Sequence, residues 1–324
     1  MYRTGWNEPT KNYTMTSFAI GCLVQWYECD IIEEYLDTLN IAIDQYPGRV
    51  EVDIKICTSQ DLEKAESSDA LDKAIRKITT ACDKYYFNSR IKDTIYTIAD
   101  YRRDFNFEYC NLADVLIWGE SDMLVPSQMF NVLDLLHKNT PVTKYLATFG
   151  ICKMWDDSWK MLEHPKFTDK PFIENDYDNW WSVKYTMNAE EMEKINSETS
   201  ELEIHQLPQH KFNGCGLVIS SEVIKSGVNI PQSVFFVHED TAFMLMTQKV
   251  LGNIPQFSIR NILVVHNRNH PKKRMYVKGE SGDTMNKRRR SNDWYVKANK
   301  LSEENCYNIF NPNYKSKTWE DVWK

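Results

Sequence analysis

Two carboxylates one residue apart, Glu120 and Asp122, come directly after a short apolar run. This run, Val115 to Trp118, is typical of a buried strand, and Gly119 ends it. Placing two carboxylates at the edge of a buried strand costs free energy unless something positive lies between them. A divalent cation, together with the phosphates that such a cation holds, would meet that need. The spacing therefore predicts a metal site at the end of this strand.

Three further segments repeat the pattern of a strand that ends in polar residues. They lie at 22–30, 57–60 and 238–240. In open α/β sheets, ligands bind in the crevice at the carboxyl ends of the strands. We therefore expect these polar residues to meet Glu120 and Asp122 at one edge of a sheet.

The elements that must position these residues are visible as apolar patterns. Residues 17–25 and 50–57 are predicted strands, and 31–43 has apolar residues at helical spacing, with Asp30 as its N-cap. A strand–helix–strand unit of this kind begins an α/β sheet. Further helices are predicted at 58–88, 89–112, 130–136, 189–200, 221–227 and 241–251, and further strands at 142–151, 234–237 and 262–265. The intervening segment 155–181 is irregular and rich in tryptophan, including Trp180 and Trp181.

The composition is that of a water-soluble globular chain. Of its 324 residues, 42% are hydrophobic and 26% are charged. No apolar run approaches the ~18 residues of a membrane span, and the start of the sequence lacks the apolar region of a signal peptide. We therefore expect a cytoplasmic protein. The eight cysteines form no C-x-x-C pair, which predicts reduced core thiols rather than disulfides or a zinc site.

Charge is distributed unevenly along the chain. Residues 266–300 hold eleven Lys and Arg against three Asp and Glu, so this segment carries +8 and the rest of a chain of net charge −7 carries −15. A basic segment on an acidic body indicates contact with something anionic. The densest run, 287–290, is also compatible with a solvated charge run.

In their order and spacing, residues 17–270 resemble the GT-A fold nucleotide-sugar glycosyltransferases, and family 2 in particular. Glu120-Ser-Asp122 resembles their D-x-D metal motif, and the sequence from Phe212 to Ser220 is similar to their glycine-rich acceptor-side strand. His238-Glu-Asp240 before an apolar helix resembles their E-D motif, and His266 lies where many of these enzymes place a further metal ligand. Two features depart from the pattern: Glu120 replaces an aspartate, and Thr58-Ser-Gln60 replaces an acidic residue, for which Asp53 lies too deep in its strand.

The resemblance implies a mixed, mostly parallel central sheet flanked by helices, in a single main domain with a C-terminal extension. We expect an N-terminal arm at 1–16, a GT-A domain at 17–270 and a basic extension at 271–324. The domain would divide into a nucleotide-binding half, 17–126, and an acceptor half, 127–270.

The resemblance also implies roles for individual residues. Glu120, Asp122 and His266 would bind Mn²⁺ or Mg²⁺, Asp240 would be the general base of an inverting transfer, and Glu239 would orient that base or a donor hydroxyl. The implied donor contacts are Gln25, Trp26, Tyr27, Glu28, Thr58, Arg103, Gly214, Gly216 and Arg268. Arg102 and Arg274 are further candidates for pairing with the diphosphate, and Trp180 and Trp181 for stacking on an acceptor. The implied partners are a nucleotide-diphosphate sugar, with a UDP-sugar first, and an acceptor that is either a glycan or modified DNA.

Each of these residues has a simpler interpretation as well. Asp240 is a good helix N-cap, Glu120 and Asp122 suit a solvated loop, His270 competes with His266, and a pair of glycines suits a plain turn. Two other functions remain open. Nucleotidyltransferases share the fold class, but they carry a glycine-rich basic turn that 25–30 lacks. A nucleic-acid-binding protein would use the basic segment, although the acidic body disfavours that as its sole function.

Overall fold

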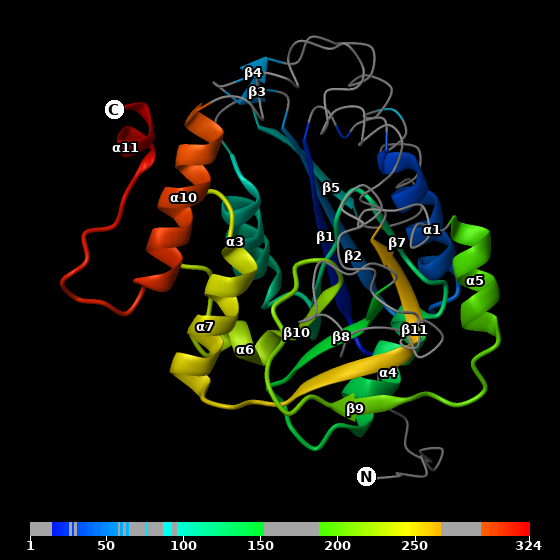
Figure 1. The fold of residues 1–324 in the computed structure, drawn as a ribbon. Helices are drawn as coiled ribbons and strands as arrows, with labels where there is room; N and C mark the ends of the chain where they lie inside the picture. Colours follow the sequence, from blue (N-terminus) through cyan, green and yellow to red (C-terminus); the bar gives the residue numbers. More distant parts are fainter. Residues whose placement is uncertain are drawn as a thin grey trace, which may run out of the picture.

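A mixed β-sheet forms the centre of the computed structural model, which describes residues 15–25, 28, 31–57, 59–60, 63–64, 76, 87–92, 96–151, 188–266 and 293–324. Within these residues the sheet has nine strands in the order β5-β2-β1-β6-β10-β8-β11-β7, with β9 paired to β11 (Figure 1). The strands are β1 (Phe18–Gln25), β2 (Val50–Cys57), β5 (Phe87–Lys92), β6 (Val115–Trp118), β7 (Met123–Leu124), β8 (Leu146–Ile151), β9 (Ile204–Gln206), β10 (Leu217–Ser220) and β11 (Gln256–His266). A separate two-stranded sheet pairs β3 (Ser59–Gln60) with β4 (Glu63–Lys64).

Most strands of the central sheet point the same way. β5, β2, β1 and β6 are consecutive parallel neighbours, and β8 and β11 form a further parallel pair in the same direction. β10 lies antiparallel between β6 and β8, whereas β7 and β9 lie antiparallel to β11. The sheet is therefore mixed and mostly parallel, as predicted. The carboxyl ends of β1, β6 and β11 and the amino end of β10 consequently share one edge.

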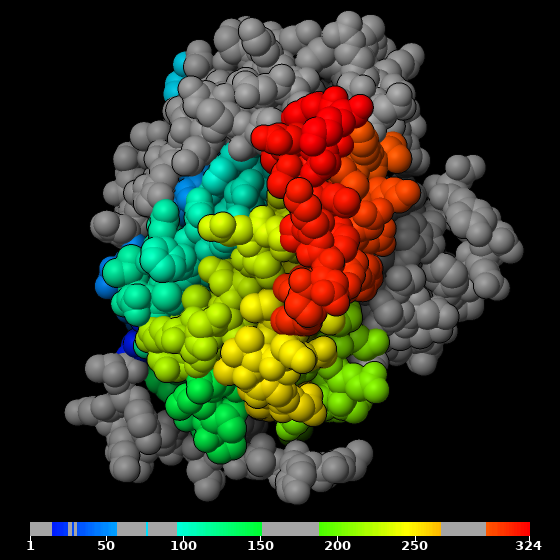
Figure 2. Space-filling view, turned by 90° about the vertical axis from the view of Figure 1, so that its left-hand side faces the viewer, coloured from blue at the N-terminus to red at the C-terminus, as the bar shows by residue number. Residues whose placement is uncertain are grey.

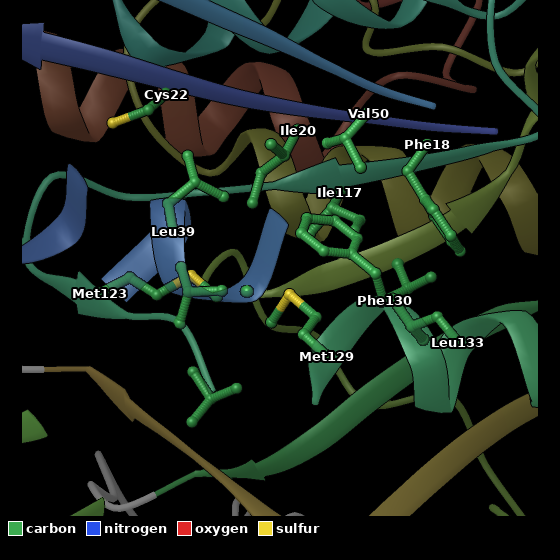
Figure 3. Close-up of a cluster of buried hydrophobic side chains, with 14 of the residues drawn as sticks. Phe18, Ile20, Cys22, Leu39, Val50, Ile117, Met123, Met129, Phe130 and Leu133 are labelled. Atoms are coloured by element: carbon green, nitrogen blue, oxygen red, sulfur yellow. The ribbon is translucent and has the colours of Figure 1, made fainter. Parts of the chain in front are cut away.

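Alternation along the strands sends side chains to two apolar layers, because successive residues of a strand face opposite sides of a sheet. In β1, Phe18, Ile20 and Cys22 belong to one core cluster, whereas Ala19 and Leu23 belong to the other. The first cluster is covered by helices α1 (Ile32–Asp44) and α4 (Met129–Asn139), as Figure 3 shows. The second is covered by α3 (Ile98–Tyr109), α6 (Ser221–Lys225) and α7 (Glu239–Leu251).

Helix α3 has a locally encoded beginning. The Thr97 side chain accepts a hydrogen bond from the backbone of Asp100, and the Asp100 side chain accepts one from the backbone of Thr97. This capping box satisfies two backbone donors that the helix itself leaves unpaired. Asn188 and Glu191 make the same arrangement at the start of α5 (Ala189–Ser197), which packs on β11 and β7. The sequence thus fixes where α3 begins, and α3 carries several of the charged residues described below.

The last part of the chain packs on the main domain. Helices α10 (Asp293–Tyr307) and α11 (Trp319–Trp323) contribute Ala298 and Val322 to a small core with Phe235 and Phe236. Figure 2 shows this C-terminal segment, in orange and red, lying alongside the yellow helix α7. The described part of the predicted C-terminal extension is therefore joined to the segment just before α7. No helix of the described residues has the length and apolar character that crossing a membrane requires.

Several sequence predictions of elements are confirmed and others are wrong. The strands at 17–25, 50–57 and 115–118 are found as β1, β2 and β6, and Asp53 is fully buried in β2. The helix predicted from residue 89 is wrong at its start, because 87–92 form β5, a parallel partner of β2. The strand predicted at 234–237 is absent, and Ile31 rather than Asp30 occupies the N-cap of α1. The first of these errors occurs because apolar residues suit a helix or a strand equally well, so that pairing with β2 decides.

Candidate active site

The carboxyl edge of the sheet brings the predicted metal ligands together. The turn after β6 is closed by a hydrogen bond from the Met123 N–H to the Glu120 carbonyl oxygen, at 3.0 Å. β7 then pairs with the end of β11, with Met123 opposite His266. As a result, His266 Nε2 lies 2.8 Å from Glu120 Oε2 and 3.5 Å from Asp122 Oδ1. Asp122 and His266 are both buried.

Arg102 on α3 links this group to the start of α7. Its guanidinium donates to Glu120 Oε1 and to the Gly214 carbonyl oxygen, at 2.8 and 2.9 Å, and it also pairs with the Glu239 carboxylate. The guanidinium lies over the Trp118 ring, 4.7 Å from its centroid. The arginine is almost completely buried, so it acts as a fixed positive charge between two carboxylates. We call Arg102, Glu120, Asp122, Glu239, Asp240 and His266 the edge cluster.

The charges in the edge cluster shift one another's protonation. Burial opposes ionisation of Glu120, but His266 and Arg102 outweigh it and lower the pKa of Glu120 to about 2. Burial likewise disfavours the charged form of His266, yet the Glu120 and Asp122 carboxylates raise its pKa. Burial raises the pKa of Glu239 to about 7; Arg102 opposes the rise and Asp240 adds to it. Within the edge cluster, four carboxylates thus face one guanidinium and one imidazole.

The start of α7 presents Glu239 and Asp240 to this edge. His238 occupies the N-cap with a left-handed backbone, φ 68°, and Glu239 is the first helical residue. The alternative that Asp240 is the N-cap is therefore wrong. Asp240 is half-buried in the first turn, where its Oδ1 accepts a hydrogen bond from the Thr241 N–H at 2.7 Å. Its carboxylate lies at the positive end of the helix dipole, which favours a negative charge.

The structure describes only some of the predicted donor contacts. Gln25 ends β1, and Glu28 is buried close enough to Cys22 for its charge to raise the pKa of that thiol, although burial is the larger cause. Arg103 stays a predicted donor contact; its guanidinium donates to the carbonyl oxygens of Ile230, Pro231 and Val234 and to Asp100, so it anchors the loop before α7. Outside the described residues lie Trp26, Tyr27, Thr58, Arg268, His270, Arg274, Trp180, Trp181 and the basic run 287–290.

The glycines beside β10 have observable structural roles. A Cβ at Gly214 would overlap the Arg102 guanidinium, so the missing side chain lets that arginine reach the edge cluster. Gly216 has φ +69°, a backbone conformation that other residues rarely adopt. Both glycines therefore shape the edge. A contact between them and a donor sugar stays a prediction.

Cys215, between these two glycines, was not predicted from the sequence to lie at the site. Glu120, Cys215 and His266 each offer one ligand atom, and these atoms all lie within 4.8 Å of one another. The sequence gives no warning of this, because Cys215 is not in a C-x-x-C pair and lies in an apolar segment. The only local signal is its position at the start of a strand, on the edge where other strands end.

The residues at this edge fit a divalent cation. Carboxylate oxygens and an imidazole nitrogen converge from β11 and the β6–β7 turn, and the four carboxylates of the edge cluster outnumber its one guanidinium and one imidazole. A divalent cation would offset that excess and would take the place of the proton between Glu120 and His266. The same arrangement could bind the phosphates that such a cation carries.

Comparison with known proteins finds similarity in structure only. No protein-family model matches the chain, and no curated protein matches its sequence. Among solved structures it is similar to S. aureus TarS 1-349 with UDP (10% identity, TM-score 0.47, covering 77% of this chain and 60% of that chain). It is also similar to the same TarS fragment with UDP-GlcNAc (10% identity, TM-score 0.49, covering 94% and 70%).

A third similar structure is the mannosyltransferase PcManGT from Pyrobaculum calidifontis in complex with GDP-Man and Mn2+. It shares 13% identity, with a TM-score of 0.46, and the match covers 93% of this chain and 73% of that one. Because these TM-scores lie below 0.5, the function of this chain must be inferred from the edge cluster itself.

Proposed function

We propose that this chain is a metal-dependent glycosyltransferase that moves a sugar from a nucleotide-diphosphate donor to an acceptor hydroxyl. The observation that carries the proposal is the convergence of Glu120, Asp122 and His266 at the carboxyl edge of the sheet. His266 is far from Glu120 and Asp122 in the sequence, and all three were expected at this edge from the order of motifs. Arg102 pairs with both Glu120 and Glu239, and so ties the start of α7, which also carries Asp240, to the same edge.

Glu120, Asp122 and His266 would hold Mn²⁺ or Mg²⁺, and a bound cation would neutralise the charge that develops on the leaving diphosphate. Arg102 positions one of these ligands. It binds Glu120 Oε1, which leaves Oε2 directed to His266. A ligand held in this way loses little conformational freedom when a cation binds.

Asp240 is assigned as the general base that takes the proton of the acceptor hydroxyl. It is half-buried, and the hydrogen bond from Thr241 fixes its Oδ1, so Oδ2 is the oxygen that we assign to the proton. Attack on the face opposite the leaving nucleotide inverts the anomeric carbon. Glu239, held by Arg102, keeps the first turn of α7 in register with the metal ligands.

Activity should depend both on the metal ligand Asp122 and on the assigned base Asp240. We would measure hydrolysis and transfer of UDP-sugars with Mn²⁺ in the wild type, Asp122→Ala, Asp240→Asn and the matched control Asp104→Asn. Asp240→Asn should lower kcat by about 10²–10⁴-fold, the usual contribution of a general base. Asp104→Asn, on the other face of α3, should retain activity. Metal-independent transfer that survives in Asp122→Ala would refute the proposal.

A nucleotidyltransferase would give a different product. If NTP and a sugar phosphate release pyrophosphate, while UDP-sugars are not turned over, the alternative class is correct.

The acceptor is proposed to be a glycan or a hydroxyl-bearing base in DNA. DNA is included because the basic segment 266–300 could contact its phosphates. If the acceptor is DNA, binding should weaken steeply with salt and fall when Arg288, Arg289 and Arg290 are neutralised. A flat salt response would remove DNA as the acceptor.

A further inference from the structure

Cys215 is held in place by the backbone around it. β10 runs antiparallel to β6 with Leu217 opposite Trp118, and the Gly216 N–H donates to the Trp118 carbonyl oxygen at 2.8 Å. The buried Asn213 side chain donates to the Cys215 carbonyl oxygen at 3.0 Å. Two independent contacts thus fix the strand start on either side of the thiol, and they set it beside the turn that carries Glu120.

The thiol completes a mixed set of ligand atoms. Its sulfur, a Glu120 carboxylate oxygen and a His266 ring nitrogen lie within 4.8 Å of one another, with the Asp122 carboxylate 3.5 Å from the same imidazole. Ligand atoms on one tetrahedral Zn²⁺ are separated by about 3.6 Å, given bonds of about 2.0–2.3 Å. The distances between the three ligand atoms are therefore short enough for small side-chain rotations to bring all three atoms onto a single ion.

We propose that Cys215 is a metal ligand together with Glu120, Asp122 and His266, so that this site disfavours Mg²⁺, one of the two ions of the proposed function, and favours thiophilic divalent ions such as Zn²⁺ or Co²⁺. The inference rests on the metal position of the proposed function, but not on sugar transfer. Thiolate and imidazole suit zinc, whereas Mg²⁺ demands oxygen ligands in a nearly ideal octahedron. Binding displaces the thiol proton to the solvent, since the thiolate is the form that ligates.

The simpler interpretation is that Cys215 is a small apolar residue of the core. It belongs to the same apolar cluster as Met123 and Val264, and it is 2% exposed. That interpretation explains the burial of the thiol but not its proximity to a carboxylate and an imidazole. The two interpretations differ in what happens to the sulfur when a metal is added, which spectroscopy reports directly.

The test is a titration of metal-stripped, reduced full-length protein with Co²⁺. In the wild type we expect sulfur-to-cobalt charge-transfer absorption in the near ultraviolet, and displacement of Co²⁺ by Zn²⁺ but not by equimolar Mg²⁺. Cys215→Ser should lose that absorption and bind Zn²⁺ at least 10-fold more weakly. The matched control is Cys110→Ser, because Cys110 is also buried but lies at the end of α3, and this variant should behave as the wild type.

Two outcomes would overturn the inference: no charge-transfer absorption in the wild type, or equal Zn²⁺ affinity in the wild type and Cys215→Ser. If Cys215→Ser does not fold, X-ray absorption of the zinc-loaded wild type decides, because a coordinated sulfur gives a scattering shell at about 2.3 Å. The inference and the proposed function fail separately. Charge transfer without sugar transfer would leave the thiolate ligand standing. Sugar transfer with Mn²⁺ that is unchanged in Cys215→Ser, together with no charge-transfer absorption, would leave only the function.

Discussion

Helix α3 contributes residues to two ionic clusters, and these clusters differ in how their charges are balanced. One side of the helix supplies Arg102 to the edge cluster. Another side faces Lys55 of β2, whose ammonium donates to the Tyr96 hydroxyl at 3.1 Å and lies 3.9 and 3.8 Å from Asp104 and Glu108. We call Lys55, Tyr96, Tyr101, Asp104 and Glu108 the lysine cluster.

In the lysine cluster, the positive charge is completely buried while its carboxylates reach water. The Lys55 side chain is 0% exposed, whereas those of Asp104 and Glu108 are 44% and 29% exposed. The rings of Tyr96 and Tyr101 face the ammonium at 5.5 and 5.4 Å, which stabilises it without adding charge. This cluster is satisfied by the chain itself and by solvent.

In the edge cluster, two of the four carboxylates are buried as well as the positive groups. Asp122 and Glu239 have side chains 0% and 9% exposed, and Arg102 is shared between Glu120 and Glu239. Solvent has little access to Asp122 and Glu239, and a bound cation of the kind proposed above would offset their charge. The two clusters therefore differ in their carboxylates: those of the lysine cluster are partly exposed, whereas Asp122 and Glu239 of the edge cluster are buried together with their positive partners.

The largest effect should come from removing the shared arginine. Arg102→Met leaves the buried Glu239 and the half-buried Glu120 without their common partner, and should lower the free energy of unfolding by about 3–5 kcal/mol. Lys55→Met removes a charge whose carboxylate partners remain hydrated, and should cost only about 1–2 kcal/mol. Urea denaturation of both variants measures the difference. Equal losses would show that the two clusters are balanced alike.

Metal should stabilise the edge cluster and leave the lysine cluster unaffected. A divalent ion at 100 times its Kd should add about 2.7 kcal/mol to the wild type, which raises Tm by several degrees. Asp122→Asn should abolish this shift. Without metal, it should not lower Tm, since it removes a buried charge. Asp104→Asn is the matched control and should keep the full metal-induced shift in a thermal melt.

Stability should fall as the pH rises through neutrality, because the pKa of Glu239 is raised to about 7 in the folded protein from an ordinary value of 4.5. The folded state then holds a proton that the unfolded state releases, so this contribution is complete below about pH 4.5 and is lost as the pH rises to about 7. Glu239→Gln cannot titrate and should flatten this part of the profile of unfolding free energy against pH. The His266 contribution, which also falls above pH 6.5, should persist in that variant. An unchanged slope in Glu239→Gln would assign the pH dependence to His266 alone.

The smallest effect concerns the backbone at the start of α7. His238 is the non-glycine residue with positive φ among the described residues, and its ring nitrogen lies 3.0 Å from the Asn299 amide oxygen on α10. His238→Ala should be less stable than His238→Gly by about 1 kcal/mol, since alanine keeps the steric cost of the left-handed conformation. Urea denaturation of the pair measures this cost. Equal stabilities would mean that the backbone relaxes when the contact with Asn299 is lost.

Much of the sheet and part of the site were predictable from the sequence. Apolar runs gave β1, β2 and β6 with accurate ends, because alternation and turn residues are local signals. The carboxylates at the end of β6 were recognised for the same reason. The helix predicted from residue 89 was wrong at its start, because an edge strand such as β5 depends on its partner, here β2. The role of Arg103 in anchoring the loop at 230–234 was not predicted, because its neighbours in sequence do not reveal those contacts.

The sequence alone determined where β1, β2 and β6 end, since those ends are encoded within a few residues. Only the tertiary structure decided which segments of the chain meet at the edge of the sheet. Glu120 contacts His266, and Arg102 contacts Glu239, across more than a hundred residues of chain. Cys215 joins them because β10 runs antiparallel to β6, which places the start of one strand beside the end of the other. Strand direction and neighbour order are set by packing across the whole sheet, so no local pattern could have placed that thiol at the site.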